Sequence, residues 1–172
     1  LGGNDPAIIL PDCDFDSAVE NAVDGAFYNS GQSCCAVKRV LVHESLRARF
    51  VEAAAELIKK YVVGNPLEDG TTLGPVVNEA AAERVRAHVS DALAKGGKRI
   101  VDAASFTIPT LSACYLAPEL IDNASPDSLL MREETFGPAL GVAGFNSDEE
   151  AIRLTNDQPY GLTASIWTKD AA

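Results

Sequence analysis

The chain has 172 residues, about the size of one domain, and 47% of them are hydrophobic, as in an ordinary globular protein. Its formal net charge is -11, so neither nucleic acid nor an anionic membrane is expected as a partner, because an acidic surface repels phosphate groups. The sequence contains no run of about 18 apolar residues, and no transmembrane helix is expected.

Strand-like and helix-like segments alternate along the chain. Strands are expected at residues 7–10, 39–43, 99–103, 138–145 and 162–168. Helices are expected at residues 16–28, 45–61, 79–95 and 147–156. The unbroken apolar run Val40-Leu41-Val42 is typical of a parallel strand that is buried on both faces. This order predicts an α/β fold with a mainly parallel sheet.

The ends of some predicted elements carry recognisable signals. Ser17 and Glu20 have the spacing of a capping box at the start of the first helix. Residues 64–78 contain several glycines and prolines and are expected to form an irregular surface loop. Residues 104–134 show no clear pattern, since prolines interrupt them, and only 115–120 are typical of an extended segment.

A polar connection carries two adjacent cysteines, Cys34 and Cys35, between the first helix and the strand at 39–43. A cysteine acts as a nucleophile only where it is accessible and partly ionised, and an exposed connection could offer both conditions. The alternative is that these thiols are buried and fill space, as free cysteines most often do. The spacing of the residues alone leaves both interpretations open.

The other sulfur and imidazole groups argue against a metal site. The remaining cysteines are Cys13 and Cys114, the chain has two histidines, and no C-x-x-C pair is present, so no metal centre is expected. Adjacent cysteines are poorly placed for a structural disulfide. We therefore expect reduced thiols and an intracellular, cytoplasmic protein. Cys13 and Cys114 are expected to be packing residues.

Several motifs occur in a fixed order and resemble those of the aldehyde dehydrogenase superfamily. They are Leu1-Gly2-Gly3-Asn4, Phe27-x-Asn29-x-Gly31-Gln32-x-Cys34-x-Ala36, Val63-Gly64-Asn65-Pro66, Leu73-Gly74-Pro75, Glu133-Glu134-Thr135-Phe136-Gly137-Pro138 and Asn156-Asp157-Gln158-Pro159-Tyr160-Gly161-Leu162. The resemblance covers essentially the whole chain. It implies a three-layer architecture, with helices on both faces of the mainly parallel sheet.

The resemblance also implies a reaction. Cys34 matches the nucleophile of the family, whose thiolate attacks an aldehyde to form a thiohemiacetal. Hydride then passes to NAD or NADP, and the resulting thioester is hydrolysed to a carboxylic acid. Two alternatives are a CoA-acylating relative, in which CoA accepts the acyl group, and a member of the fold without catalytic activity.

Four residues match the cofactor side of the family's site. Glu134 matches a carboxylate that hydrogen-bonds the nicotinamide ribose, and Phe136 matches an aromatic residue that packs near the nicotinamide ring. Leu1 and Gly2 belong to a motif expected beside the cofactor. Without the resemblance, Glu134 would be interpreted as a solvated loop charge and Phe136 as a core residue.

The resemblance assigns minor roles to three other polar residues and to Cys35. Asn29 and Gln32 are expected to shape the cysteine loop through hydrogen bonds from their side chains to the backbone. His43 ends a strand and is not expected to act as the base for Cys34. Cys35 is expected to be a bystander, with a redox role through a bond to Cys34 as the less favoured alternative.

The resemblance finally implies that residues 1–172 are a catalytic domain truncated at both ends. The general base, the cofactor-binding fold and the oligomerisation segments of the family are expected to lie outside this chain. The chain alone is therefore expected to be inactive, and the full-length enzyme is expected to act on a small aldehyde as a homodimer or homotetramer. Cys34 should face outward, toward a cofactor domain.

Overall fold

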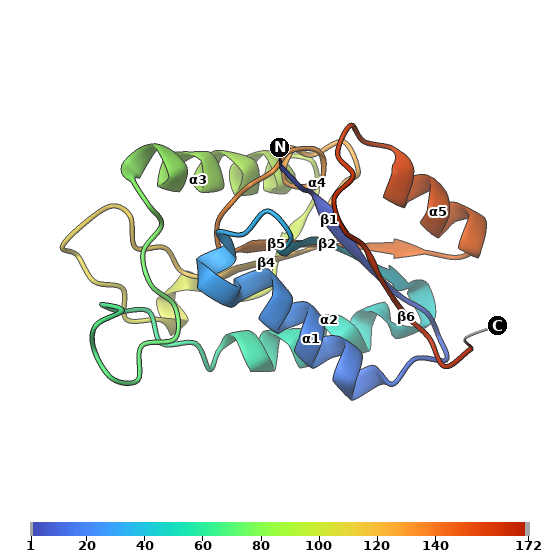
Figure 1. Cartoon of the computed structure of the whole chain (residues 1–172), viewed down its shortest axis with the longest axis horizontal. Helices are drawn as coiled ribbons and strands as arrows, with labels where there is room; N and C mark the ends of the chain where they lie inside the picture. Colours follow the sequence, from blue (N-terminus) through green and yellow to red (C-terminus); the bar gives the residue numbers. More distant parts are fainter. Residues whose placement is uncertain (1, 171–172) are drawn as a thin grey trace.

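A computed structural model describes residues 2–170, and within them six strands form one sheet in the order β3-β4-β5-β2-β1-β6 (Figure 1). The strands are β1 (Asp5–Ile9), β2 (Val37–His43), β3 (Lys98–Arg99), β4 (Glu119–Asp122), β5 (Ala139–Phe145) and β6 (Ser165–Trp167). The pairing of β3 with β4 is antiparallel, and the other four pairings are parallel. The predicted α/β fold with a mainly parallel sheet is confirmed.

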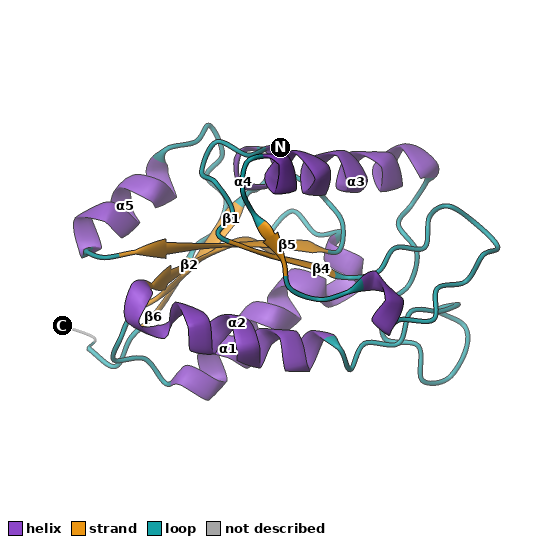
Figure 2. Cartoon of the chain, turned by 180° about the vertical axis from the view of Figure 1, so that it is seen from behind, coloured by secondary structure: helices purple, strands orange, loops and turns teal. Residues whose placement is uncertain are grey.

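Helices cover both faces of this sheet. They are α1 (Phe15–Phe27), α2 (Glu44–Ile58), α3 (Glu79–Ala94), α4 (Leu129–Arg132) and α5 (Asp148–Asn156), with short 3-10 turns at Tyr28–Gly31 and Ala103–Ser105. Figure 2 shows α1 and α2 on one face and α3, α4 and α5 on the other. The predicted three-layer arrangement is therefore confirmed.

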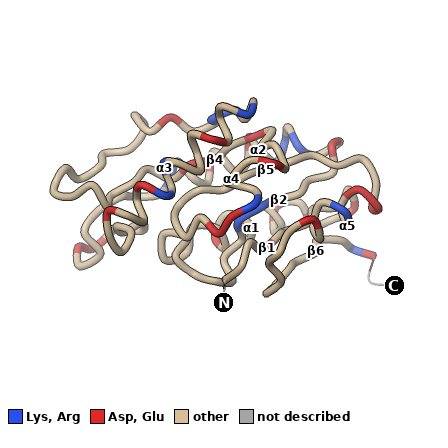
Figure 3. The backbone as a smooth tube through the Cα atoms, turned by 90° about the horizontal axis from the view of Figure 1, so that it is seen from above, with Lys and Arg blue, Asp and Glu red and all other residues tan. Residues whose placement is uncertain are grey.

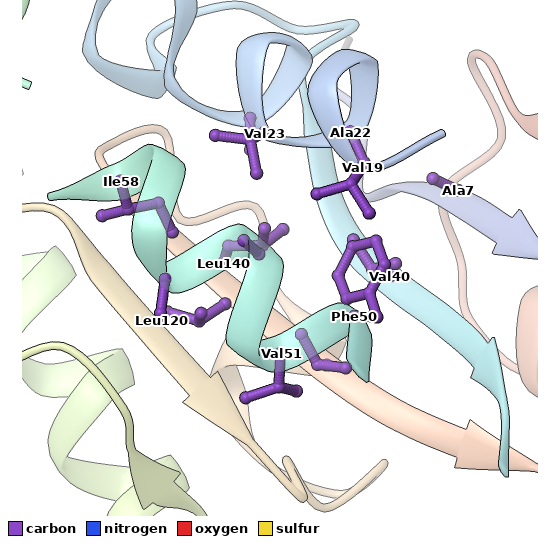
Figure 4. Close-up of a cluster of buried hydrophobic side chains, with 14 of the residues drawn as sticks. Ala7, Val19, Ala22, Val23, Val40, Phe50, Val51, Ile58, Leu120 and Leu140 are labelled. Atoms are coloured by element: carbon purple, nitrogen blue, oxygen red, sulfur yellow. The ribbon is translucent and has the colours of Figure 1, made fainter. Parts of the chain in front are cut away.

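The central strand β2 divides the hydrophobic core into two halves. Val40 and Val42 pack in the cluster formed with α1 and α2, while Leu41 packs in the cluster formed with α3, α4 and α5. Successive side chains of a strand point to opposite faces, so an unbroken apolar run fills both clusters. Figure 4 shows the first cluster, in which Val40 and Leu140 of the sheet pack with Val19 of α1 and Phe50 of α2.

The first helix begins earlier than the predicted capping box implies. Its N-cap is Asp14, whose carboxylate accepts a hydrogen bond of 3.3 Å from the backbone N–H of Ser17. The prediction that Ser17 caps the helix was wrong, because the equally suitable aspartate three residues upstream takes that role.

Replacing Asp14 with alanine should therefore lower the free energy of unfolding by about 1 kcal/mol, because one backbone N–H loses its acceptor. The exposed Glu20→Ala variant should stay within about 0.5 kcal/mol of the wild type. Urea unfolding monitored by circular dichroism measures both values. A larger loss in Glu20→Ala than in Asp14→Ala would contradict this assignment of the cap.

Several other predicted boundaries differ from the structure. The strand predicted at 99–103 is reduced to two exposed residues, β3, at the edge of the sheet. The predicted helix 45–61 ends at Ile58, and the unpatterned region 104–134 contains β4 and α4. Strand β1 begins at Asp5, before the apolar run, because Asp5 already pairs with Val37 of β2. Thr163 donates a hydrogen bond of 2.7 Å to the buried Asp5 carboxylate.

Charged residues are spread over the elements and do not gather on one of them, as Figure 3 shows. Within residues 2–170, no helix has the length and apolar character that crossing a membrane would require.

Candidate active site

Cys34 lies in a turn immediately before β2. It is therefore near the first residue of this strand, and His43 is the last. Its side chain is exposed, as is that of Cys35. The interpretation of Cys34 as a buried packing residue is therefore excluded. A reagent or a second domain can reach the thiol from solvent.

The backbone before the cysteines has an uncommon conformation. Asn29, Ser30 and Gly31 have φ values of +50°, +57° and +72°, in the left-handed region that glycine and asparagine tolerate best. Asn29 Nδ2 donates to the carbonyl of Gln32 at 3.1 Å, and Gln32 Nε2 donates to the carbonyl of Asn29 at 3.2 Å. The predicted role of Asn29 and Gln32 in shaping the loop is confirmed.

The cysteine loop is tied to the segment at residues 74–77. Ser30 Oγ donates to the carbonyl of Gly74 at 2.9 Å. Gln32 donates to the carbonyl of Pro75 at 3.2 Å and accepts from the backbone N–H of Val77 at 2.8 Å. The two motifs are 40 or so residues apart in the sequence, and these side chains join them in space.

The Gly2-Gly3 pair joins the Cys34 turn to Glu134. A methyl group on Gly3 would overlap the carbonyl oxygen of Cys34. The backbone N–H of Gly3 donates to Glu134 Oε1 at 3.0 Å, and a methyl group on Gly2 would lie 2.8 Å from Glu134 Oε2. Three separate motifs therefore meet at one place, and the close approach of Gly3 to the backbone of Cys34 requires a glycine.

Glu134 and Phe136 are both half-buried. The hydrogen bond from Gly3 holds the Glu134 carboxylate, so it is not a freely solvated loop charge. Phe136 has a φ of +52°, a strained conformation for an aromatic residue, and such strain is concentrated at functional sites. The neighbouring Glu133 accepts a hydrogen bond of 3.1 Å from Tyr160, which joins the last motif to this segment.

Comparison with known proteins leads to the same family as the motifs. The description of the aldehyde dehydrogenase family fits residues 1–172. This chain belongs to the aldehyde dehydrogenase family. It is 38% identical over 169 residues to the mitochondrial succinate-semialdehyde dehydrogenase of Oryza sativa subsp. japonica, covering 98% of this chain and 32% of that protein. It is 36% identical over 170 residues to the NADP(+) succinate-semialdehyde dehydrogenase of Saccharomyces cerevisiae, covering 99% of this chain and 34% of that protein.

Solved structures of aldehyde dehydrogenases also superpose on this chain. The succinate-semialdehyde dehydrogenase of Burkholderia pseudomallei gives a TM-score of 0.93 at 38% identity, covering 99% of this chain and 35% of that one. The NADP-dependent glyceraldehyde-3-phosphate dehydrogenase of Bacillus halodurans, complexed with NADP, gives 0.91 at 38% identity, covering 99% and 34%. The chain spans about a third of the length of the curated relatives that it matches.

Other residues that the sequence analysis named in this aldehyde dehydrogenase chain lie away from Cys34 or outside the described residues. His43 caps α2 and lies 2.8 Å from Ser45 Oγ, at the far end of β2 from the cysteines. Cys13 is buried and Cys114 is half-buried, in agreement with their predicted packing roles. Leu1, expected on the cofactor side, lies outside the described residues. No cluster of potential metal ligands occurs within residues 2–170.

The burial of two cations in the aldehyde dehydrogenase chain was not predicted from the sequence. Arg39 is 3% exposed, and its guanidinium donates to the carbonyls of Asn4, Leu154 and Thr155 at 2.8, 3.0 and 3.2 Å. Burial lowers the pKa of Arg39 to about 10. The other cation is Lys38, which is 2% exposed beside the cysteine turn. Lys38 and Arg39 are the second and third residues of β2. Because charged side chains are rarely buried, the sequence alone predicts that both are exposed to solvent.

A buried histidine packs against the segment that carries Glu134. His88 Nδ1 lies 3.0 Å from Thr135 Oγ1, and both residues are buried. Burial lowers the pKa of His88 from its ordinary value of 6.5. Below pH 6.5 the unfolded chain therefore binds a proton that the folded chain resists, and the folded state loses stability as the pH falls.

The free energy of unfolding should accordingly decrease on acidification from pH 6.5 toward the lowered pKa of His88. His88→Asn removes this contribution, so the difference in stability between the wild type and the variant should shrink over that range. Urea unfolding at several pH values measures the difference. A difference that is constant with pH would contradict the lowered pKa.

Proposed function

We propose that this chain is the cysteine-bearing catalytic domain, residues 1–172, of an enzyme that oxidises a small aldehyde to a carboxylic acid with NAD or NADP. Cys34 is the nucleophile. The observation that carries the proposal is the meeting of three motifs at one exposed thiol: the Cys34 carbonyl packs on Gly3, and the backbone N–H of Gly3 binds Glu134. Membership of the family supports the reaction class.

The Cys34 turn provides two groups for the reaction. The thiolate adds to the aldehyde carbon, and a carbon–sulfur bond forms while the carbonyl π electrons move to oxygen. Within residues 2–170 the backbone N–H of Cys34 donates to no other group, so it can bind the developing oxyanion. Loss of hydride leaves a thioester on Cys34. Attack by water then releases the carboxylic acid and returns the thiol.

Glu134, Phe136 and Gly2 fit the nicotinamide end of a bound cofactor, which supplies the hydride acceptor when present. The backbone N–H of Gly3 donates to Glu134 Oε1, and within the described residues no group donates to Oε2. Glu134 Oε2 can therefore accept a hydrogen bond from a ribose hydroxyl. Phe136 is partly exposed and offers an aromatic surface. Relatives named for NADP use, from yeast and from Bacillus halodurans, support a nicotinamide cofactor.

Three further expectations belong to the same proposal. The isolated chain is inactive in aldehyde oxidation, since it spans about a third of its relatives. The enzyme works inside the cell, where reducing conditions preserve an exposed thiol such as Cys34. It assembles as a homodimer or homotetramer, and the outer edge of β6, where Ile166 is 62% exposed, supports assembly.

A chimera tests the reaction. Residues 2–170 replace the matching segment of the Saccharomyces cerevisiae succinate-semialdehyde dehydrogenase, which is 36% identical over 170 residues. We expect the chimera to form NADPH from succinate semialdehyde and NADP+. Cys34→Ala should lower kcat by about 10⁴-fold or more, as loss of a covalent nucleophile does, and Cys35→Ala serves as the matched control. Unchanged turnover in the Cys34→Ala chimera would contradict the proposal.

A further inference from the structure

Lys38 is a buried cation without a carboxylate partner. Its side chain is 2% exposed, and among the described residues no carboxylate lies within ion-pair distance of Nζ. An ammonium group loses its hydration when it is buried, so a position of this kind is unfavourable unless other groups compensate. Such residues are more common at functional sites than in ordinary cores.

The compensating groups are carbonyls of the cysteine turn. Lys38 Nζ donates to the carbonyl of Ser33 at 2.7 Å and to the carbonyl of Ala36 at 3.0 Å. Ser33 and Ala36 are the residues on either side of Cys34 and Cys35 in the sequence. One amine therefore bridges both ends of the two-residue turn that presents the thiols, alongside a backbone hydrogen bond of 3.3 Å from Ala36 N to Ser33 O.

The charge of Lys38 also acts on its surroundings. Burial lowers the pKa of Lys38. The acidic groups Glu134 on the segment after α4, Asp5 on β1, Cys35 and Cys34 oppose that lowering. The Lys38 ammonium and the acidic groups around the cysteine turn are therefore close enough for their charges to act on one another.

We propose that Lys38 is a positioning residue for Cys34: its ammonium clamps the Ser33 and Ala36 carbonyls around the cysteine turn, and its positive charge favours the reactive thiolate. This inference rests on the proposed role of Cys34 as nucleophile and adds a second group to it. Because its side chain is 2% exposed, Lys38 is assigned no contact with substrate or cofactor, and its proposed effect is on the reactivity of the thiol.

Alkylation of the 172-residue chain with iodoacetamide between pH 6 and pH 10 tests the inference, with tandem mass spectrometry to assign the label to each cysteine. Lys38→Gln keeps an amide donor for the carbonyls and removes the charge. It should slow alkylation of Cys34 at pH 7 by about tenfold, because the cation beside the cysteine turn is lost. Lys38→Arg restores the charge and should recover most of the rate. The exposed Lys60→Gln is the matched control and should leave the profile unchanged.

The outcomes separate this inference from the proposed function. If Cys34 of the wild type reacts rapidly near neutral pH and Lys38→Gln has the same profile, the inference fails and the nucleophile stands. If wild-type Cys34 reacts no faster than Cys35, the proposed function fails, and the inference fails with it.

A second measurement needs no substitution of the lysine, in case Lys38→Gln does not fold. The chain is labelled with ¹³C at the lysine ε-carbons, and the titration of Lys38 is followed by NMR in the wild type and in Cys34→Ser. Removal of the thiolate should lower the pH at which Lys38 titrates. An unchanged Lys38 titration would overturn the inference, because it would show that no coupling exists between the two groups.

Discussion

Cys34→Ser is expected to abolish the rapid acylation of the chain by p-nitrophenyl acetate, with a loss in rate of about 10³-fold or more. An activated thiolate displaces p-nitrophenolate from the ester and keeps the acetyl group, so the wild type should release about one equivalent in a burst. This reaction needs no hydride acceptor and can be measured on the chain alone. Absorbance of p-nitrophenolate in a stopped-flow instrument records it.

Cys35→Ser is the matched control for this experiment. Cys35 is also exposed, and its Sγ lies 3.3 Å from Ser33 Oγ, a contact that a serine hydroxyl preserves. The burst should persist in this variant, since the motif places the reactive thiol at Cys34. A burst that disappears in Cys35→Ser and persists in Cys34→Ser would transfer the role of nucleophile to the neighbouring residue.

Gly31→Ala is expected to lower the free energy of unfolding by about 2–4 kcal/mol, the sum of left-handed backbone strain and steric overlap. Gly31 has a φ of +72°, and a methyl group added to it would overlap the carbonyl oxygen of Gly137. Relief requires the cysteine loop to move away from the segment of Phe136. We therefore also expect slower alkylation of Cys34. Urea unfolding and iodoacetamide labelling measure the two effects.

Gly161→Ala provides the comparison for Gly31→Ala. Gly161 is exposed, has no atom within 4 Å of an added methyl group and does not have a left-handed φ, so its variant should stay within about 0.5 kcal/mol of the wild type. A Gly31→Ala chain as stable as Gly161→Ala would show that the loop can shift at little cost, contrary to the tight packing seen between the motifs.

The layers of the fold were predictable because hydrophobic patterning is a local signal. Val40-Leu41-Val42 predicts a strand buried on both faces, and the structure places it at the centre of the sheet. The helix beginning near Ser147 was likewise predicted, since its N-cap and acidic first turn are adjacent in the sequence. Asp14 was missed because two suitable caps stand three residues apart, and only the fold decides between them.

The site was predictable in its members and not in its contacts. The motifs identified Cys34 and Glu134 as candidates, whereas the link between them through Gly3 depends on how distant segments pack. Lys38 was missed for a similar reason. A lysine next to an arginine is usually solvated, and only the carbonyls of the cysteine turn explain its burial.

If Cys34 is the nucleophile, aldehyde oxidation passes through a covalent bond to Cys34. This bond can be observed by mass spectrometry of the yeast chimera, quenched in acid during turnover with succinate semialdehyde and NADP+. We expect a succinyl group on the peptide that contains Cys34, and no such group in the Cys34→Ala chimera. NADPH formation with no succinyl group on Cys34, or with that group on another residue, would exclude Cys34 as the nucleophile.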